Sequence, residues 1–426
     1  MPVKVLHTSD WHLGAMLHNE DRKEEHRRFL SWLLKTIETE NIDALVVSGD
    51  IFDVYAPSTA AQRLYYNFLA GVIKLKIAPE VFIIAGNHDS QHFLGAPADI
   101  LSELNVHIVS TIDIEKPENL IFEIKNKNNK TTLVICAIPF LREKDLKVVN
   151  TVKPCGADSL LEQYNKTAAA FYHAVYKLAK TKNTPVLMTG HFYLDGGMKS
   201  DDYSERAREV GCLQSIPREA LPDADYYALG HLHKSQTVNS KNYIRYSGSP
   251  LPMSFSEAES EKSVVIAVFD EDSAESKPAI QLKKIPVWQN LRQIKGSPDM
   301  ILAELKRIKA GGENVWIEIQ VTDYEGDLFN FWDTLEKEVL CDSPLELPLE
   351  PSYKILAKQD MRNRQNTSDW RGGDESAGLS DLSPASVFEK FMKDEKINAE
   401  DIDIFMNMFN ELYHDVIVNE NGETEI

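Results

Sequence analysis

The chain has 426 residues, and its 66 Asp and Glu outnumber its 46 Lys and Arg, which gives a formal net charge of −20 at pH 7. This length exceeds what one hydrophobic core usually fills, so we expect two or three folding units. No stretch approaches the roughly 20 apolar residues that a membrane span requires. The polar motifs already begin at Asp10, which leaves no room for a cleaved leader before them. We therefore expect a soluble cytoplasmic protein with no membrane contact.

The charge balance argues against nucleic acid as a partner, because phosphate contacts normally come from Lys and Arg. However, residues 385–426 hold three Lys and Arg against eleven Asp and Glu, so much of the excess lies at one end of the chain. Bound metal ions can also reverse the sign of the local potential. The four cysteines form no C-x-x-C pair, which favours reduced thiols in packing roles: Cys136, Cys155, Cys212 and Cys341.

Five polar motifs stand between residues 10 and 233, and each follows a short apolar run. Runs of this kind, rich in Val and Ile and ended by Gly or a polar residue, are typical of buried strands in an α/β fold. The motifs are Asp10-Trp11-His12, Gly49-Asp50-Ile51-Phe52-Asp53, Gly86-Asn87-His88-Asp89, Gly190-His191 and Gly230-His231-Leu232-His233. Ligands bind beyond the carboxyl ends of the strands in such folds, so we expect the motifs to converge on one site.

The residue types predict a centre of two divalent metal ions. Carboxylate and amide oxygens mixed with imidazole nitrogens, without thiolates, suit Mn, Fe or Zn better than Ca. Asp50 is the best candidate for a ligand shared by both ions, because the preceding glycine permits a tight turn. His231 and His233 would point to one side if the strand continued, and each could reach a different ion. Asn87 offers a neutral ligand, which leaves His88 to act on the scissile phosphate or its leaving oxygen.

Amphipathic runs between the motifs predict helices that connect the strands, over residues 24–39, 58–75 and 158–180. After the fifth motif, residues 243–246 and 263–269 predict short strands, which we assign to a second sheet. The charged segment 195–209 either shapes access to the site or is an ordinary solvated loop. The remaining histidines fit structural or solvated roles, although His92 could line the entrance: His7, His18, His26, His92, His107, His173 and His414.

A second unit begins near residue 285. Residues 300–309 and 328–339 have helical spacing, and residues 315–321 alternate as a half-buried strand. We therefore expect a small α+β module over residues 285–359, which either borders the site or only stabilises the chain.

The last part of the sequence changes in composition. Residues 360–383 are rich in Arg, Asn, Ser, Gly and Asp, so we expect a flexible linker. Residues 384–426 contain two amphipathic runs, each with an apolar face that a short helix cannot bury alone. These helices either fold back or dock on another protein chain, and the preceding linker favours docking.

In this order, the motifs resemble those of the calcineurin-like metallophosphoesterase superfamily: D-x-H, G-D-x-x-D, G-N-H-D, G-H and G-H-x-H. Within it, the chain resembles the SbcD family of bacterial nuclease subunits through residues 6–14, 49–53 and 246–250. The resemblance implies a catalytic role for His88 and a supporting role for Asp53. It also implies that one ion is held by Asp10, His12, Asp50 and His233, and the other by Asp50, Asn87, His191 and His231.

The same resemblance implies a two-sheet αβ-sandwich nuclease domain over residues 1–284, a cap domain over residues 285–359, and a C-terminal tail that docks on the coiled coil of an SbcC-type ABC ATPase. The implied activity is Mn-dependent hydrolysis of DNA. It comprises ATP-dependent 3′–5′ exonuclease action on duplexes and endonuclease action on single strands and hairpins, in DNA recombination, replication and repair near the nucleoid. Any ATP dependence must come from the partner, because this chain has no P-loop motif.

The resemblance also implies a homodimer within a heterotetramer. Residues 58–75 could supply the dimer helix, although an ordinary core helix fits this segment equally well.

Two other functions stay open on the sequence. A phosphomonoesterase or cyclic-nucleotide phosphodiesterase could use the same scaffold. Ser/Thr phosphatases of the superfamily carry an Arg just after the second Asp, however, whereas Val54-Tyr55-Ala56 follow Asp53 here. A non-catalytic assembly subunit could keep the metal ions for structure alone, but such a site would need neither His88 nor an open coordination position.

Overall fold

The computed structural model describes residues 2–142, 144–146, 157–194, 215–238, 241–270, 277–322, 324, 326, 328–335, 337 and 353–361. All of these except residue 361 lie in one compact unit, Met1–Asp360. The predictions for residues 195–209 and for the linker and helices beyond residue 361 lie outside the described residues. So do those for Cys155, Cys212, Cys341 and His414.

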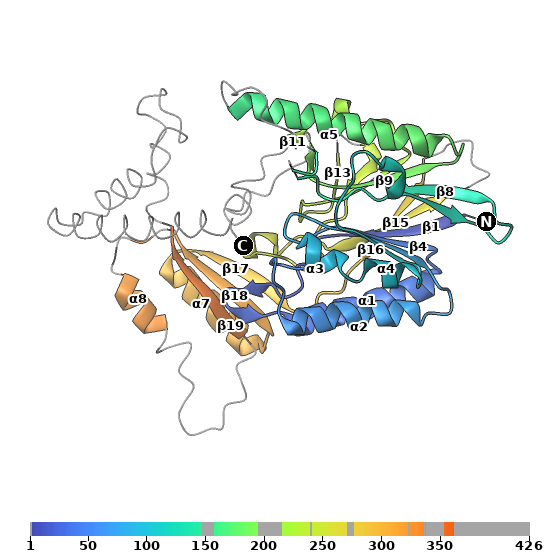
Figure 1. Ribbon diagram of the computed structural model, residues 1–426. Helices are drawn as coiled ribbons and strands as arrows, with labels where there is room; N and C mark the ends of the chain where they lie inside the picture. The colour runs from blue at the N-terminus through green and yellow to red at the C-terminus, as the bar shows by residue number, and fades with distance from the viewer. Residues whose placement is uncertain are drawn as a thin grey trace, which may run out of the picture. The chain divides into compact units, whose positions relative to one another are not determined.

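The first sheet has six strands in the order β16-β15-β1-β4-β5-β6 (Figure 1). Four of them are parallel and were predicted or flanked by predicted elements: β1 (Val3–Thr8), β4 (Ala44–Ser48), β5 (Glu80–Ile84) and β6 (Val106–Val109). The predicted connecting helices are present as α1 (Lys23–Glu40) and α2 (Thr59–Ile73). The Ser58 side chain caps α2 by accepting a hydrogen bond from the backbone N–H of Ala61.

The assignment of residues 263–269 to the second sheet is wrong. They form β15 (Ser263–Phe269), which pairs antiparallel with β1, and β16 (Ala279–Lys284) pairs with β15 at the edge of the same sheet. Most of β15 is buried, with Val265 and Ala267 in the cluster between the sheets and Val264 and Ile266 in the cluster beneath the helices. A strand that is apolar on both faces fits the middle of either sheet, so its sequence does not choose between them.

The second sheet has the order β13-β14-β12-β9-β8-β7. Its central strands are parallel, and an antiparallel strand lies at each edge. The strands are β7 (Ile121–Lys125), β8 (Thr131–Cys136), β9 (Val186–His191), β12 (Tyr226–Gly230), β13 (Gln236–Val238) and β14 (Lys241–Tyr246). The predicted helix over residues 158–180 is present as α5 (Ala157–Lys180).

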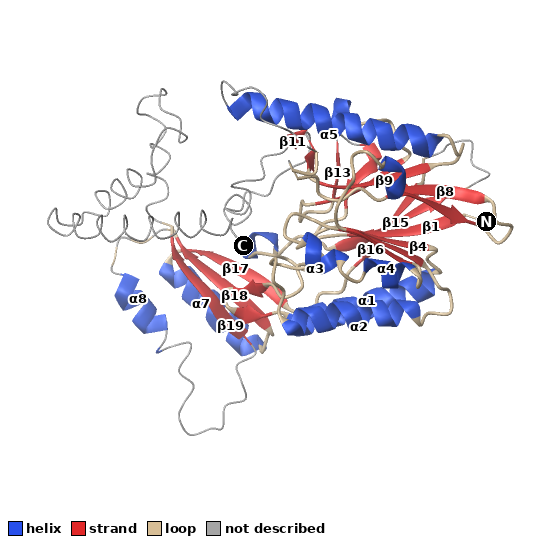
Figure 2. Cartoon of the chain, viewed as in Figure 1, coloured by secondary structure: helices blue, strands red, loops and turns tan. Residues whose placement is uncertain are grey.

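The two sheets pack face to face, with helices outside them. In β1, Val3 and Val5 belong to the apolar cluster between the sheets, whereas Leu6 belongs to the cluster that contains residues of α1 and α2. The other face of the second sheet packs against α5, and Figure 2 shows α1 and α2 on one outer face and α5 on the other. This arrangement is an α/β sandwich of four layers, and Cys136 is a buried free thiol within it.

A small third sheet follows. It has three parallel strands, β17 (Asn290–Gly296), β18 (Val315–Val321) and β19 (Tyr353–Asp360), with the helices α7 (Pro298–Gly311) and α8 (Leu328–Leu335). Three residues of α7 pack on the sheet: Ile301, Leu305 and Ile308. The predicted strand and helices are present, although the described part of α8 ends four residues before the predicted helix does. β17 and β19 were not predicted.

The shorter elements complete the described chain. They are β2 (Met16–Leu17), β3 (Glu20–Asp21), α3 (Gln91–Gly95), α4 (Ala98–Ser102), β10 (Tyr193–Leu194) and β11 (Ser215–Ile216), and the 3-10 helices η1 (Pro117–Leu120), η2 (Arg218–Ala220) and η3 (Phe255–Glu257). Among the described helices, none has both the length and the apolar composition needed to cross a bilayer.

Candidate metal centre

The structure brings the five sequence motifs together, although they follow strands of two different sheets. Three motifs follow β1, β4 and β5 of the first sheet, and two lie at the ends of β9 and β12 of the second. The segment after β1 runs beside the segment after β4, because the backbone N–H of Asp10 donates to the Gly49 carbonyl at 3.0 Å and that of His12 donates to Asp50 at 3.0 Å. Across the sheets, the backbone N–H of His231 donates to Asp10 Oδ1 at 2.9 Å.

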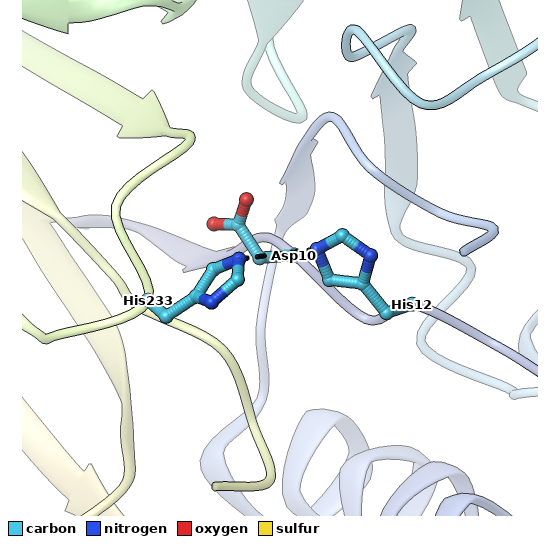
Figure 3. A group of neighbouring side chains, drawn as sticks. All are labelled: Asp10, His12 and His233. Carbon is cyan, nitrogen blue, oxygen red and sulfur yellow. Dashed lines mark hydrogen bonds between the residues drawn. The ribbon is translucent and has the colours of Figure 1, made fainter. Parts of the chain in front are cut away.

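One group of side chains consists of Asp10, His12 and His233, all buried. Figure 3 shows the two imidazoles turned toward each other with the Asp10 carboxylate beside them. The Nε2 atoms of His12 and His233 lie 3.2 Å apart, and His12 Nε2 lies 3.6 Å from Asp50 Oδ2. These residues therefore present nitrogen and oxygen donors to one small space.

A second group forms around Asn87. Its side-chain oxygen lies 3.0 Å from His191 Nε2 and 3.3 Å from His231 Nδ1. His191 Nε2 also lies 3.3 Å from Asp50 Oδ2, the same oxygen that faces the first group. Asp50 thus lies between the two groups, as its place in the sequence predicted.

The donor atoms fit bound cations in number, type and spacing. Two ligand atoms held at about 2.1 Å by one ion lie roughly 3.0 to 3.4 Å apart, and the separations around His12, His191 and Asn87 are 3.0 to 3.6 Å. His191 Nδ1 donates to the Ser48 main-chain oxygen at 2.8 Å, which leaves a lone pair on Nε2 in the neutral ring. That lone pair faces the Asp50 carboxylate and the Asn87 carbonyl, and three acceptors that converge in this way need a cation.

Carboxylates also lie on the outer side of the two histidines of the first group. His12 Nδ1 lies 3.2 Å from Asp53 Oδ1, and His233 Nδ1 lies 3.8 Å from Glu257 Oε1. A carboxylate beside Nδ1 favours a proton on that nitrogen and turns the lone pair of Nε2 inward. This geometry agrees with the supporting role expected for Asp53.

The charges within the centre favour ionised groups. Burial alone would raise the pKa of the Asp50 carboxyl, but the imidazoles of His191 and His12 hold it well below its ordinary range. Burial also opposes a charge on His191, yet the Asp50 carboxylate outweighs it and raises the pKa of that imidazole to about 9. The pKa of Asp10 rises to about 6 because of burial and the nearby Asp50 charge, which the imidazole of His191 only partly offsets. A dense set of anionic and imidazole groups is thus held at the sandwich edge.

His88 lies beside the two groups. Its Nδ1 donates to the main-chain oxygen of Asp53 at 2.8 Å, and its backbone N–H donates to Asp50 Oδ1 at 2.9 Å. Its ring centroid lies 5.0 Å from that of His12, nearly perpendicular to it. The proton on Nδ1 is therefore fixed by a carbonyl, and Nε2 is the ring nitrogen left for other chemistry.

Comparison with protein families identifies the scaffold. The family model described as calcineurin-like phosphoesterase matches residues 3–235, which is more than half of the chain. The chain belongs to the calcineurin-like phosphoesterase family. The match contains all five motifs of the phosphoesterase centre and the strands of both sheets that lead into them.

Three curated relatives are each named as the SbcD component of the nuclease SbcCD. The chain is 30% identical to that of Escherichia coli K12 over 422 residues, which cover 97% of this chain and 98% of the relative. It is 31% identical to that of Bacillus subtilis over 334 residues, with 75% and 79% covered. It is 34% identical to that of Rhodobacter capsulatus over 262 residues, with 60% and 64% covered.

Two features of this phosphoesterase centre were not foreseen. The sequence suggested that His231 and His233 would point to one side of a continuing strand, but β12 ends at Gly230 and His231 has a φ of 104°. The two rings nevertheless reach different groups. Asp89, to which no role was assigned, is fully buried and accepts hydrogen bonds from the backbone N–H groups of Ile51, Phe52 and Gly86 at 2.8 to 3.1 Å. It ties the loop after β5 to the loop after β4.

The backbone at the centre is unusual. Asp10, His12 and Asp50 have φ values of 44° to 52°, in the left-handed region that non-glycine residues rarely adopt. The motif glycines allow close packing around them. A Cβ at Gly230 would collide with the main-chain oxygen of Ser48, and one at Gly86 would collide with Asp50. Strained backbone of this kind is typical of functional sites and persists only where the surrounding structure fixes it.

The other described histidines have structural or exposed positions, as expected. His7 is buried between the sheets, where it bonds the Tyr226 hydroxyl and the Leu229 main-chain oxygen, both at 3.1 Å. His26 is buried beneath the first sheet and bonds the Trp11 carbonyl at 3.1 Å. His92 is exposed.

Proposed function

We propose that this chain is the nuclease subunit of an SbcCD-type complex and hydrolyses phosphodiester bonds of DNA with the help of two divalent metal ions. One observation carries the proposal: a single carboxylate oxygen, Asp50 Oδ2, lies 3.6 Å from His12 Nε2 in one donor group and 3.3 Å from His191 Nε2 in the other. A shared carboxylate between two donor sets is the arrangement that paired ions require. The similarity to the SbcD component of the Escherichia coli nuclease along 97% of the chain supports DNA as the substrate.

In this proposal, two sets of residues hold the ions. One set is Asp10, His12, Asp50 and His233, and the other is Asp50, Asn87, His191 and His231. Mn²⁺ is our choice of metal, because mixed oxygen and nitrogen donors without thiolate suit it, with Mg²⁺, Fe and Zn²⁺ as competitors. When bound, two such ions supply a hydroxide at neutral pH and neutralise charge on the phosphoryl oxygens.

His88 acts on the substrate in this scheme. Because the Asp53 carbonyl holds the proton on Nδ1, Nε2 is the atom that can donate a proton to the leaving oxygen or hydrogen-bond the scissile phosphate. Asp53 and Glu257 orient His12 and His233 from behind, and Asp89 fixes the loop that carries His88. The chain thus contributes orientation and proton transfer at named atoms.

We assign the other parts of the chain by the same similarity. Residues 1–284 form the nuclease domain, residues 285–359 form a cap domain that borders the cleft, and residues 360–383 link it to helices over 384–426 that dock on the coiled coil of an SbcC-type ATPase. α2 is the candidate dimer helix of a heterotetramer. The complex would act in the cytoplasm, at the nucleoid, as an ATP-dependent 3′–5′ exonuclease and a hairpin endonuclease in DNA recombination, replication and repair.

The test is an assay of the purified full-length chain, with and without Mn²⁺, on duplex DNA, on single-stranded DNA and on an aryl phosphodiester. We expect Mn²⁺-dependent cleavage of both DNA and the small ester. Cleavage of the small ester alone would favour a phosphodiesterase of small substrates. Absence of cleavage of any substrate, with metal bound, would favour a non-catalytic assembly subunit.

A further inference from the structure

Tyr55 and Arg142 form a contact pair beside His88. The guanidinium carbon of Arg142 lies 5.5 Å from the centre of the Tyr55 ring, within the range of a cation–π contact. Tyr55 follows two residues after Asp53, whose main-chain oxygen accepts the bond from His88 Nδ1. Arg142 Nη2 donates to the main-chain oxygen of Asp89, the residue after His88, at 2.9 Å. Both members of the pair are thus anchored to the neighbours of His88.

Arg142 is held firmly yet keeps most of its hydrogen-bonding capacity. Its backbone N–H donates to Asp145 Oδ2 at 3.3 Å, and the same oxygen accepts from the Gln91 side chain at 3.0 Å, which fixes this segment to α3. Within the described part of the chain, no carboxylate lies at ion-pairing distance from the half-buried guanidinium. A guanidinium has five N–H donors, and the Asp89 carbonyl accepts from one of its nitrogens. The others suit phosphate oxygens.

Tyr55 is placed differently from the aromatic residues of the core. It is 57% exposed, and its neighbour Val54 is 53% exposed. Arg142 supports the ring, while much of its surface faces solvent. An exposed aromatic ring next to a cation, at the edge of a phosphodiesterase centre, has the elements of a single-strand binding platform: a surface for base stacking and a partner for the backbone.

We propose that Tyr55 stacks an unpaired base of the nucleotide next to the scissile phosphate, while Arg142 binds a phosphate of the same strand. This inference rests on the proposed nuclease function and names its substrate class as DNA with an unpaired nucleotide at the site of cleavage. Inside a duplex, both faces of a base are already stacked on its neighbours, so the ring can engage only a base at a frayed end, in a loop or in a single strand.

The main test compares two substrates of the full-length chain in Mn²⁺: a single-stranded deoxyoligonucleotide and bis(p-nitrophenyl) phosphate, which has no base. We expect Tyr55→Ala to lower the ratio of kcat/KM for the oligonucleotide to that for the ester about tenfold, chiefly through KM. Tyr55→Phe keeps the ring and should retain the ratio. An unchanged ratio in Tyr55→Ala, or an equal loss in Tyr55→Phe, would overturn the proposal.

Tyr243→Ala is a matched control. Lys277 Nζ lies 3.9 Å from the centre of the Tyr243 ring, so this variant also removes a tyrosine–cation contact, but Tyr243 lies in the first half of β14, away from the motifs. We expect it to leave the substrate ratio unchanged. A tenfold fall here would contradict a specific role for Tyr55.

A binding measurement separates this proposal from the nuclease function itself. In a His88→Ala background, an oligonucleotide with 2-aminopurine at its terminal position should lose fluorescence on binding, because the base stacks on Tyr55. The additional change Tyr55→Ala should remove that quenching, and persistent quenching would overturn the proposal. If the unaltered chain cleaves neither substrate, the nuclease function fails, while the fluorescence result still decides the role of Tyr55.

Discussion

His12 and His233 come from opposite sheets of the sandwich and are 221 residues apart in the sequence, yet their Nε2 atoms lie 3.2 Å apart. Each ring has a carboxylate near its other nitrogen, Asp53 for His12 and Glu257 for His233. The pair makes sense as two ligands of one ion, because two imidazole lone pairs at this distance would otherwise repel each other. The packing of the two sheets is therefore part of the metal centre.

Removal of the carboxylate behind His12 should weaken the centre without abolishing it. Asp53→Ala takes away the group that favours a proton on His12 Nδ1, and the loss of such an outer partner typically lowers metal affinity 10- to 100-fold. Titration of the metal-free protein with Mn²⁺, followed by calorimetry, measures the change. Unaltered affinity would show that Asp53 does not orient His12.

Replacement of His88 separates catalysis from metal binding. His88→Ala should lower kcat on DNA and on an aryl phosphodiester at least 100-fold, because a group that transfers protons typically contributes this much. The variant should keep near-normal metal content, since His88 Nδ1 bonds a main-chain carbonyl. Metal content by mass spectrometry checks this expectation, and simultaneous loss of metal and activity would mean that His88 is itself a ligand.

The motif glycines should not tolerate a methyl group. A Cβ at Gly86 would collide with the Asp50 backbone nitrogen and carboxylate, so Gly86→Ala should cost roughly 1 to 3 kcal/mol of unfolding free energy and weaken metal binding. Gly311→Ala is the control, because its nearest neighbour would be a Glu313 side-chain atom at 3.6 Å. Urea denaturation should show little change, or slight stabilisation, for the control. Equal effects of both changes would contradict the steric explanation.

Folding stability should decrease in acid because of buried histidine. Burial lowers the pKa of His7 to about 3, although its bond to the Leu229 carbonyl opposes the shift, and the ordinary value of 6.5 applies in the unfolded chain. Between these values the unfolded chain binds the extra proton, so this stability is complete above pH 6.5 and is lost as the pH falls toward 3, at up to about 1.4 kcal/mol per pH unit. His7→Gln should reduce that slope, measured by urea denaturation in EDTA between pH 4 and 7. An unchanged slope would show that His7 is not buried in its neutral form.

Much of the fold was predictable because the chain alternates clear strands and amphipathic helices through α5. The motifs after β1, β4, β5, β9 and β12 indicated strand ends, and the carboxyl ends of strands gather ligands whether they belong to one sheet or two. The sheet to which β15 belongs was not predictable, since Val264 to Ala267 are apolar without alternation and suit either sheet. β17 also has no signal, because Asn290–Gly296 contains only two large apolar residues, Leu291 and Ile294.

The site was predictable in its residue types but not in its supports. Asp50 and Asn87 could be singled out because each follows a motif glycine. The hydrogen bonds that Asp89 accepts from Ile51, Phe52 and Gly86 depend on how two loops meet in space, and a lone Asp gives no sign of that. The contact of Arg142 with Tyr55 spans 87 residues and likewise has no local pattern. Long-range contacts of this kind become visible only in the folded chain.

Anomalous scattering from crystals grown with Mn²⁺ tests the dinuclear centre most directly. We expect two manganese peaks about 3.5 to 4 Å apart, with the Asp50 carboxylate between them, His12 and His233 on one ion, and Asn87 and His191 on the other. A single peak, or two peaks without Asp50 in contact with both, would contradict a shared-carboxylate centre.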